Sequence, residues 1–135
     1  MANNKNYLIK NTTVVNEGES IVSDVLVKNG RIEKIGAAIQ TKFAVTEING
    51  EGNHLLPGVI DDQVHFREPG LTHKATIYTE SKAAVAGGVT SFMEMPNTVP
   101  PVFTQALLEE KYQIAAATSL ANYSFFMGTS NDNAD

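Results

Sequence analysis

The alternation of apolar strand-like and helix-like segments after Pro57-Gly58 most strongly limits the fold of this chain. The segments follow one another in the order β-α-β-α-β, at residues 59–66, 76–86, 89–95, 104–120 and 122–127. Helices between mostly apolar strands are typical of parallel sheets, in which each crossover is helical. The sequence therefore predicts an α/β fold for residues 57–135, built on a parallel sheet or barrel.

Residues 1–56 have a different composition, with short β-branched runs separated by turns and no cluster of titratable groups. The clearest signal is Asn29-Gly30 between DVLVK and RIEKIG. Asn-Gly suits the two positive-φ positions of a type I′ turn, and both flanks contain strand formers. We therefore predict a hairpin here and a small β scaffold for the whole segment.

Charge and composition exclude several classes of function. The net charge of −5 disfavours non-specific binding to nucleic acid or to an anionic membrane. The sequence contains no cysteine, so disulfides and thiolate metal sites are excluded. The N-terminus lacks a signal-peptide pattern and no apolar run approaches a membrane span, so we expect a cytoplasmic protein.

Polar side chains gather in the first strand after Pro57-Gly58, in the stretch IDDQVHFREPG. If this strand is extended throughout, Asp61, Gln63, His65 and Arg67 share one face. Parallel α/β folds place their active sites at this carboxyl end of the strands. The alternative is a solvated strand edge, with Arg67-Glu68 as an exposed pair before a Pro-Gly turn.

The second strand ends in a similar way, at Met95-Pro96-Asn97-Thr98. The amide of Asn97 can both donate and accept hydrogen bonds, which suits a carboxylate or ring amide, although Pro-Asn is also ordinary turn chemistry. Glu94 alternates with its neighbours and could point into a barrel. We expect His54 and His73 to lie at the surface.

Three motifs in order, HFREPGLTHK, AGGVT and MPNT, resemble the dihydroorotase branch of the amidohydrolase superfamily. The resemblance implies that residues 1–56 form the β-sandwich portion of a composite domain. Residues 57–135 would then form the first three β/α units of a TIM (β/α)₈ barrel. Because such a barrel needs about 250 residues, we expect a truncated, N-terminal part of a longer enzyme. The later catalytic residues would lie beyond residue 135, and the segment alone would be inactive.

The resemblance also implies roles for individual residues. His65 matches the second histidine of a zinc-binding motif, whereas Gln63 stands where the family has the first, and Asp61 could act in its place. Arg67 and Asn97 match residues that hold the substrate carboxylate. The family reaction is the reversible cyclisation of N-carbamoyl-L-aspartate to L-dihydroorotate in pyrimidine biosynthesis, with one or two zinc ions as cofactors.

Two alternatives remain open at this point. A sister cyclic amidohydrolase, such as an allantoinase or dihydropyrimidinase, would share the fold, but Arg67 and MPNT favour a substrate with a carboxylate. A non-catalytic dihydroorotase-like partner of aspartate carbamoyltransferase is kept open by Gln63, because an amide is a poor zinc ligand. In a dihydroorotase or a sister hydrolase, the partner is a small-molecule substrate. Because faces of the strands would stay uncovered in the truncated segment, we also expect a homo-oligomer.

Overall fold

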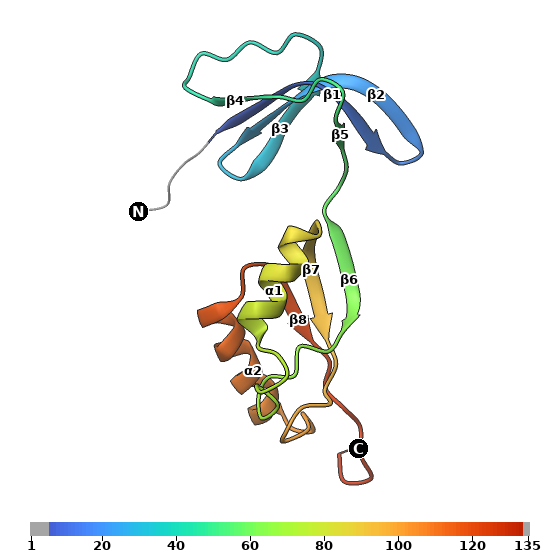
Figure 1. Ribbon diagram of the computed structural model, residues 1–135, viewed down its shortest axis with the longest axis vertical. Coiled ribbons are helices and arrows are strands. Elements are labelled where there is room, and N and C mark those ends of the chain that lie inside the picture. The colour runs from blue at the N-terminus through green and yellow to red at the C-terminus, as the bar shows by residue number, and fades with distance from the viewer. Residues whose placement is uncertain (1–5, 134–135) are drawn as a thin grey trace. The chain divides into compact units, whose positions relative to one another are not determined.

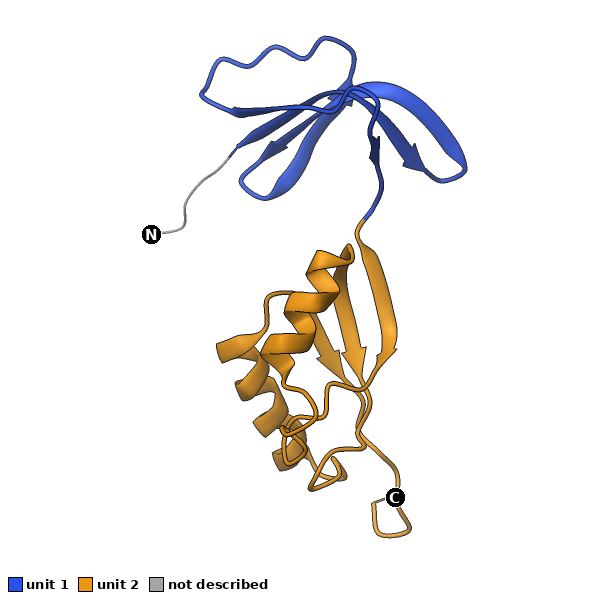
Figure 2. Cartoon of the chain, in the orientation of Figure 1, with its two compact units in different colours: residues 1–57 blue, residues 58–135 orange. Residues whose placement is uncertain are grey.

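The computed structural model describes residues 6–133 and divides the chain into two compact units. Unit 1 ends at Pro57 and unit 2 begins at Gly58 (Figure 2). Along the described part of the chain, no helix combines the length and apolar composition needed to cross a bilayer.

Unit 1 is one five-stranded mixed sheet (Figure 1). Its strands are β1 (Tyr7–Asn16), β2 (Glu19–Lys28), β3 (Arg31–Gly36), β4 (Thr46–Asn49) and β5 (His54–Leu55). The order is β3-β2-β1-β4, with β5 also on β1; β1 to β3 are antiparallel, and β4 and β5 run parallel to β1. The described strands of this unit all belong to one sheet.

Positive-φ residues form both hairpin turns of this sheet. Asn29 and Gly30 have φ of 53° and 74°, as the predicted type I′ turn between β2 and β3 requires. The turn between β1 and β2 has the same pattern at Glu17 and Gly18, with φ of 50° and 82°. Glutamate is an unusual residue for this conformation, so the sequence did not reveal the second hairpin.

A buried carboxylate, that of Asp24, fixes an irregularity in unit 1. The pairing of β1 with β2 shifts between Ile9 and Thr12, and Asn11 adopts a φ of 55°. Asp24 accepts hydrogen bonds from the backbone N–H of Asn11 at 3.0 Å and of Ile39 at 2.9 Å. These bonds, that from Asn11 foremost, lower the pKa of Asp24. One carboxylate thus joins the bulge in β1 to the segment after β3.

We expect Asp24→Ala to lower the free energy of unfolding by about 2–4 kcal/mol, because one buried and one partly buried N–H group lose a charged acceptor. Asp24→Asn should abolish the part of the free energy of unfolding that depends on pH in the acid range. The pKa of Asp24 is lower in the folded state than in the unfolded chain. The carboxylate therefore stabilises the folded state fully at pH values above the unfolded pKa of about 3.9, and this stabilisation is lost as the pH falls through the folded pKa. Urea unfolding from pH 2 to 7 measures both, with Glu33→Ala as an exposed control. Identical acid profiles for wild type and Asp24→Asn would contradict this.

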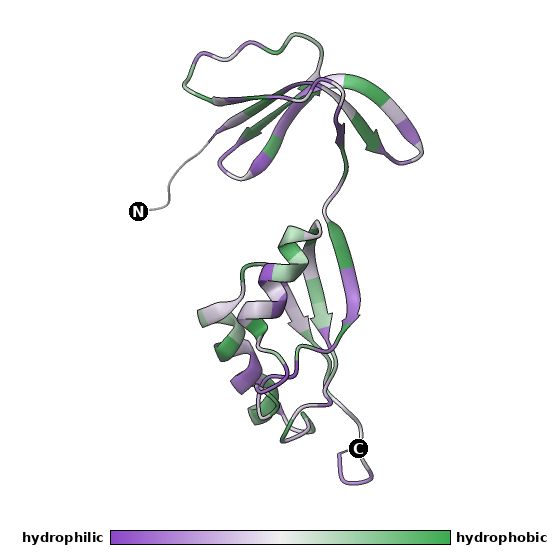
Figure 3. Ribbon diagram, viewed as in Figure 1, coloured by the Kyte–Doolittle hydropathy of each residue, from purple (hydrophilic) through white to green (hydrophobic). Residues whose placement is uncertain are grey.

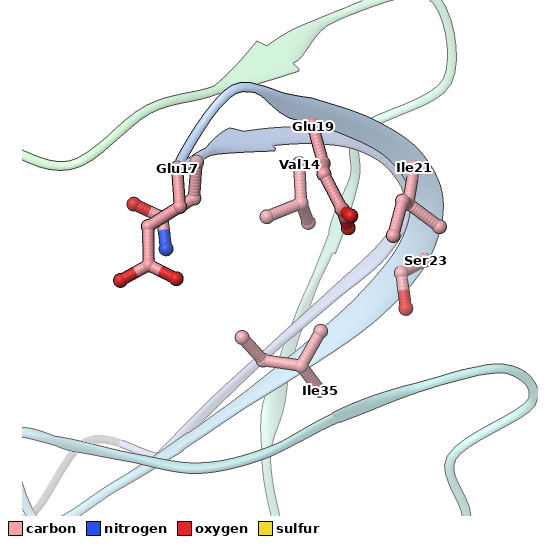
Figure 4. Close-up of a pocket in the computed structure, with 7 residues that line it drawn as sticks. Val14, Glu17, Glu19, Ile21, Ser23 and Ile35 are labelled. Carbon is pink, nitrogen blue, oxygen red and sulfur yellow. The ribbon is translucent and has the colours of Figure 1, made fainter.

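Part of the unit 1 sheet is hollowed and open (Figure 4). Its lining residues come from β1, β2, β3 and the first turn: Val14, Asn16, Glu17, Glu19, Ile21, Ser23 and Ile35. Ile21 and Ile35 remain more than half exposed. Its polar lining consists of Asn16, Glu17, Glu19 and Ser23.

Unit 2 is a three-stranded parallel sheet with two helices. Its elements are β6 (Val59–Val64), α1 (Ile77–Ala86), β7 (Val89–Glu94), α2 (Gln105–Thr118) and β8 (Asn122–Phe125), and the strand order is β6-β7-β8. This confirms the predicted β-α-β-α-β order. The strands and both helices contribute to one core, so the helices cover the same face of the sheet (Figure 1). The core residues are Phe66, Ile77, Phe92, Ala115 and Phe125.

Local signals explain where the helices begin and end. Thr76 and Thr104 are the N-caps of α1 and α2, and each side chain accepts a hydrogen bond from a first-turn N–H. After α1, Gly88 adopts a φ of 91°, a conformation that glycine reaches without strain. The caps fix the helix lengths, and with them the positions of the loops at the carboxyl ends of the strands.

Candidate active site

The carboxyl end of β6 is less regular than its sequence predicted. The pairing of β6 with β7 shifts by one residue between Asp61 and Val64, and the strand ends at Val64. This shift breaks the two-residue alternation on which a shared face for Asp61, Gln63, His65 and Arg67 depended. That prediction is therefore wrong as stated, although Val64 and Phe66 do pack on the core as expected.

Asp61 and Gln63 lie exposed near the end of β6 (Figure 3 shows this strand changing from apolar to polar). The Asp61 carboxylate accepts a hydrogen bond from the Gln63 backbone N–H at 3.2 Å, so it interacts with its own strand. Among residues 6–133, neither side chain forms a hydrogen bond with His65.

His65 and Asn97 are brought together from the ends of neighbouring strands. His65 Nδ1 lies 2.9 Å from Asn97 Oδ1. An amide oxygen can only accept, so Nδ1 carries the proton and the lone pair of the neutral ring is at Nε2. The Asn97 Nδ2 group keeps two N–H donors for another partner. This pair can thus offer an imidazole lone pair and amide donors side by side.

Arg67 has an unusual backbone conformation with a φ of 72°, in the left-handed region that non-glycine residues seldom occupy. Its side chain is half-buried, and its N–H donates to Glu94 Oε1 at 3.0 Å. Within residues 6–133 its guanidinium forms no ion pair. A planar guanidinium can bind a carboxylate through two parallel hydrogen bonds.

The side chain of the next residue, Glu68, is held by a hydrogen bond to α1. Its Oε2 accepts a hydrogen bond from the backbone N–H of Ile77, the first residue of α1, at 2.8 Å. A carboxylate is favourable at this positive end of the helix dipole. The alternative of an ordinary exposed Arg67-Glu68 pair is therefore wrong: both residues are half-buried, and each is tied to a different element.

Beneath the loop, Glu94 and Lys111 form a buried ion pair. Glu94 Oε2 lies 2.9 Å from Lys111 Nζ, and both side chains are at most 1% exposed. The contact lacks hydrogen-bond geometry, whereas Nζ donates well to the Met95 carbonyl at 3.2 Å. Burial raises the pKa of Glu94 and lowers that of Lys111, and their mutual attraction opposes both shifts. The suggestion that Glu94 points into a barrel is wrong, because it faces α2.

Sequence reasoning missed Lys111, although a signal was present. Leu108, Tyr112 and Ala115 follow one another at helical spacing along α2, and all three pack on the core. Lys111 lies three residues after Leu108 and so lies on the same side of the helix. A lysine at an apolar position of a helix, together with a glutamate on the adjoining strand, is the pattern from which a buried ion pair could have been predicted.

The loops after β6 and β7 pack tightly on each other. Val99 N–H donates to the Pro69 carbonyl at 3.2 Å. A Cβ on Gly70 would lie 1.9 Å from the Val99 carbonyl oxygen, and Gly70 has a φ of 82°. Glycine is therefore required both for space and for backbone conformation.

We expect Gly70→Ala to lower the free energy of unfolding by about 2–4 kcal/mol, since the loops must separate and the backbone is strained. Chemical denaturation measures this. Gly18→Ala is the matched control, with φ of 82° but open space around the new Cβ. A loss no greater than in that control would show that the contact between the loops is not tight.

A zinc site requires about three or four converging ligands. The described residues include no group of three histidine, aspartate or glutamate side chains placed to share a metal. Asp61 and His65 therefore do not belong to such a group of three among the described residues. His54 and His73 are both exposed, as expected.

Comparisons with known proteins relate this chain to cyclic amide hydrolases. The sequence model of the family described as "Dihydro-orotase-like" matches residues 52–124, more than half of the chain. A dihydroorotase of Methanosarcina acetivorans is 38% identical over 115 residues, which cover 85% of this chain and 25% of the relative. A dihydroorotase of Bacillus cereus is 46% identical over 97 residues, covering 70% of this chain and 22% of the relative.

Solved structures give a related result. An L-hydantoinase (dihydropyrimidinase) from Arthrobacter aurescens matches with a TM-score of 0.88 and 29% identity, covering 94% of this chain and 28% of that one. The chain spans about a quarter of the length of the curated relatives it matches. Because the family model covers most of unit 2 together with the end of unit 1, the chain belongs to the dihydro-orotase-like family.

Proposed function

We propose that the chain forms the N-terminal part of a dihydroorotase, which interconverts N-carbamoyl-L-aspartate and L-dihydroorotate. The observation that carries the proposal is the contact between His65 and Asn97 at 2.9 Å, at the carboxyl ends of neighbouring parallel strands, with Arg67 two residues after His65. These residues suit a small cyclic amide that bears a carboxylate. The dihydroorotases among the relatives support the same substrate.

The proposed fold of the complete protein is a β-sandwich portion followed by a TIM barrel. Consecutive strand order with both helices on one face of the sheet supports a barrel, because open doubly wound sheets carry helices on both faces. In this proposal residues 1–56 belong to the composite domain that precedes the barrel, and residues 57–135 supply its first three β/α units.

Arg67 and Asn97 would hold the substrate carboxylate. The guanidinium supplies a two-pronged donor, and Asn97 Nδ2 donates while its Oδ1 engages His65. His65 is thereby held with its Nε2 lone pair available to accept a proton or bind a ligand. The predicted zinc requires ligands from outside the described residues, and no step of the proposal depends on it.

His65→Ala in the full-length protein tests this proposal. We expect dihydroorotate hydrolysis to fall by at least about a hundredfold. His54→Ala, which removes an exposed histidine of unit 1, should leave the rate unchanged. Undiminished turnover in His65→Ala would remove His65 from the site.

The wild-type assay also separates the alternatives. Turnover of hydantoin or dihydrouracil in place of dihydroorotate would favour a sister hydrolase, as the hydantoinase likeness allows. No turnover of any cyclic amide would favour a non-catalytic partner. A cytoplasmic location, self-association and contact with aspartate carbamoyltransferase remain predictions.

A further inference from the structure

We propose that Glu94, held in place by Lys111, is a positioning residue that sets the backbone of Arg67 and thereby aims its guanidinium at the substrate carboxylate. This inference rests on the proposed function and deepens it. It concerns two almost fully buried residues: Glu94 contacts the backbone of Arg67, and Lys111 contacts Glu94.

The backbone of Arg67 needs support from outside the loop. A non-glycine residue in the left-handed region is strained. Its N–H donates to Glu94 Oε1 at 3.0 Å, and this carboxylate is almost fully buried. A charged acceptor in a buried setting forms a strong, directional hydrogen bond. Glu94 is thus placed to hold the conformation that fixes the direction of the Arg67 side chain.

Lys111 in turn fixes Glu94 from α2. Its Nζ contacts Glu94 Oε2 at 2.9 Å, donates to the Met95 carbonyl at 3.2 Å and lies 4.8 Å from the centre of the Phe125 ring. The Met95 N–H also donates to the Val64 carbonyl at 3.0 Å. One ammonium group is therefore anchored at the carboxyl end of β7, where β6 is also attached, and it lies beside the Glu94 carboxylate.

Stability alone gives a weak reason for this ion pair. Burial of two charges is unfavourable, and a well-packed apolar pair of similar volume is often as stable or more so. The surrounding core is apolar, with Phe92, Ala115 and Phe125 nearby. The pair does supply what an apolar pair cannot, namely an acceptor for the N–H of Arg67 and a donor for the carbonyl of Met95.

Two double variants of the full-length protein separate positioning from stability. Glu94→Gln/Lys111→Met removes both charges but keeps an amide oxygen for the Arg67 N–H. Glu94→Met/Lys111→Met removes the charges and the acceptor. We expect KM for dihydroorotate to be about tenfold higher in the second than in the first, with a smaller change in kcat. In an Arg67→Ala background this difference should vanish, because the residue being positioned is absent.

Amide hydrogen exchange at Arg67 provides a readout that does not depend on activity. Protection should be similar in wild type and in Glu94→Gln/Lys111→Met, and at least about tenfold lower in Glu94→Met/Lys111→Met. Lys10→Met, which breaks the exposed pair with Glu47, should change neither protection nor KM. If Glu94→Met/Lys111→Met does not fold, Glu94→Leu/Lys111→Met takes its place.

The two readouts distinguish the possible failures. Equal protection of the Arg67 amide and equal KM in the two double variants would overturn the positioning role. If the protection differs as expected but even the wild type does not turn over dihydroorotate, the proposed function fails while the Glu94 contact stands. A difference in KM that persists in the Arg67→Ala background would show that Glu94 acts on another part of the site.

Discussion

Lys111→Met should lower the free energy of unfolding of unit 2 by about 3–5 kcal/mol, the effect expected when one partner of a buried ion pair is removed. Glu94 would keep its backbone contact to Arg67 but lose the cation 2.9 Å away. Lys10→Met removes a lysine from an exposed pair and should cost about 1 kcal/mol or less. Urea unfolding followed by circular dichroism measures both.

The loss in Lys111→Met should also depend on pH. Burial already raises the pKa of Glu94, and removal of the lysine raises it further. Because the folded state then binds the proton more tightly than the unfolded chain, stability is highest below the unfolded pKa of about 4.3 and falls as the pH rises through the folded pKa. A loss independent of pH, or no larger than in Lys10→Met, would show that the pair is not effectively buried.

Arg67→Ala should lower kcat/KM for dihydroorotate about a hundredfold, mainly through KM. The substrate carboxylate would lose a two-pronged charged partner, and a charged hydrogen bond left unmade costs about 1.5–3 kcal/mol. Arg67→Lys is the matched control: it keeps the charge but not the planar fork, so its kcat/KM should be intermediate. Steady-state kinetics of the full-length protein measure these effects.

A second substrate without a carboxylate serves as a control for Arg67→Ala. Turnover of 5,6-dihydrouracil, the same ring without the carboxylate, should change little in Arg67→Ala. Equal losses for both substrates would mean that Arg67 supports the fold of the site and does not recognise the carboxylate.

The regular parts of the fold were readable from the sequence because local chemistry decides them. Asn29-Gly30 has the two residues that a type I′ turn requires, and its dihedral angles agree. The order of apolar strand-like and helix-like segments after Pro57-Gly58 predicted the parallel unit. The register shift between Asp61 and Val64 could not be predicted from the sequence, because it belongs to the pairing with β7 and no residue of β6 indicates it.

The site was predictable only where it depends on strand order. Parallel strands bring their carboxyl ends together, so His65 and Asn97 could be expected to lie near each other, and they do. Grouping Asp61 and Gln63 with His65 assumed an unbroken alternation, which the shift between Asp61 and Val64 interrupts. Glu94 and Lys111 required knowledge of which helix face meets which strand, which the sequence pattern suggested only weakly.

The specificity ratio of the wild-type, full-length protein tests the central claim most directly: kcat/KM for L-dihydroorotate divided by kcat/KM for 5,6-dihydrouracil. If Arg67 and Asn97 receive a carboxylate, the ratio should exceed about a hundred, because the neutral ring leaves both groups without their partner. A ratio of one or less would contradict the account and assign the site to neutral cyclic amides.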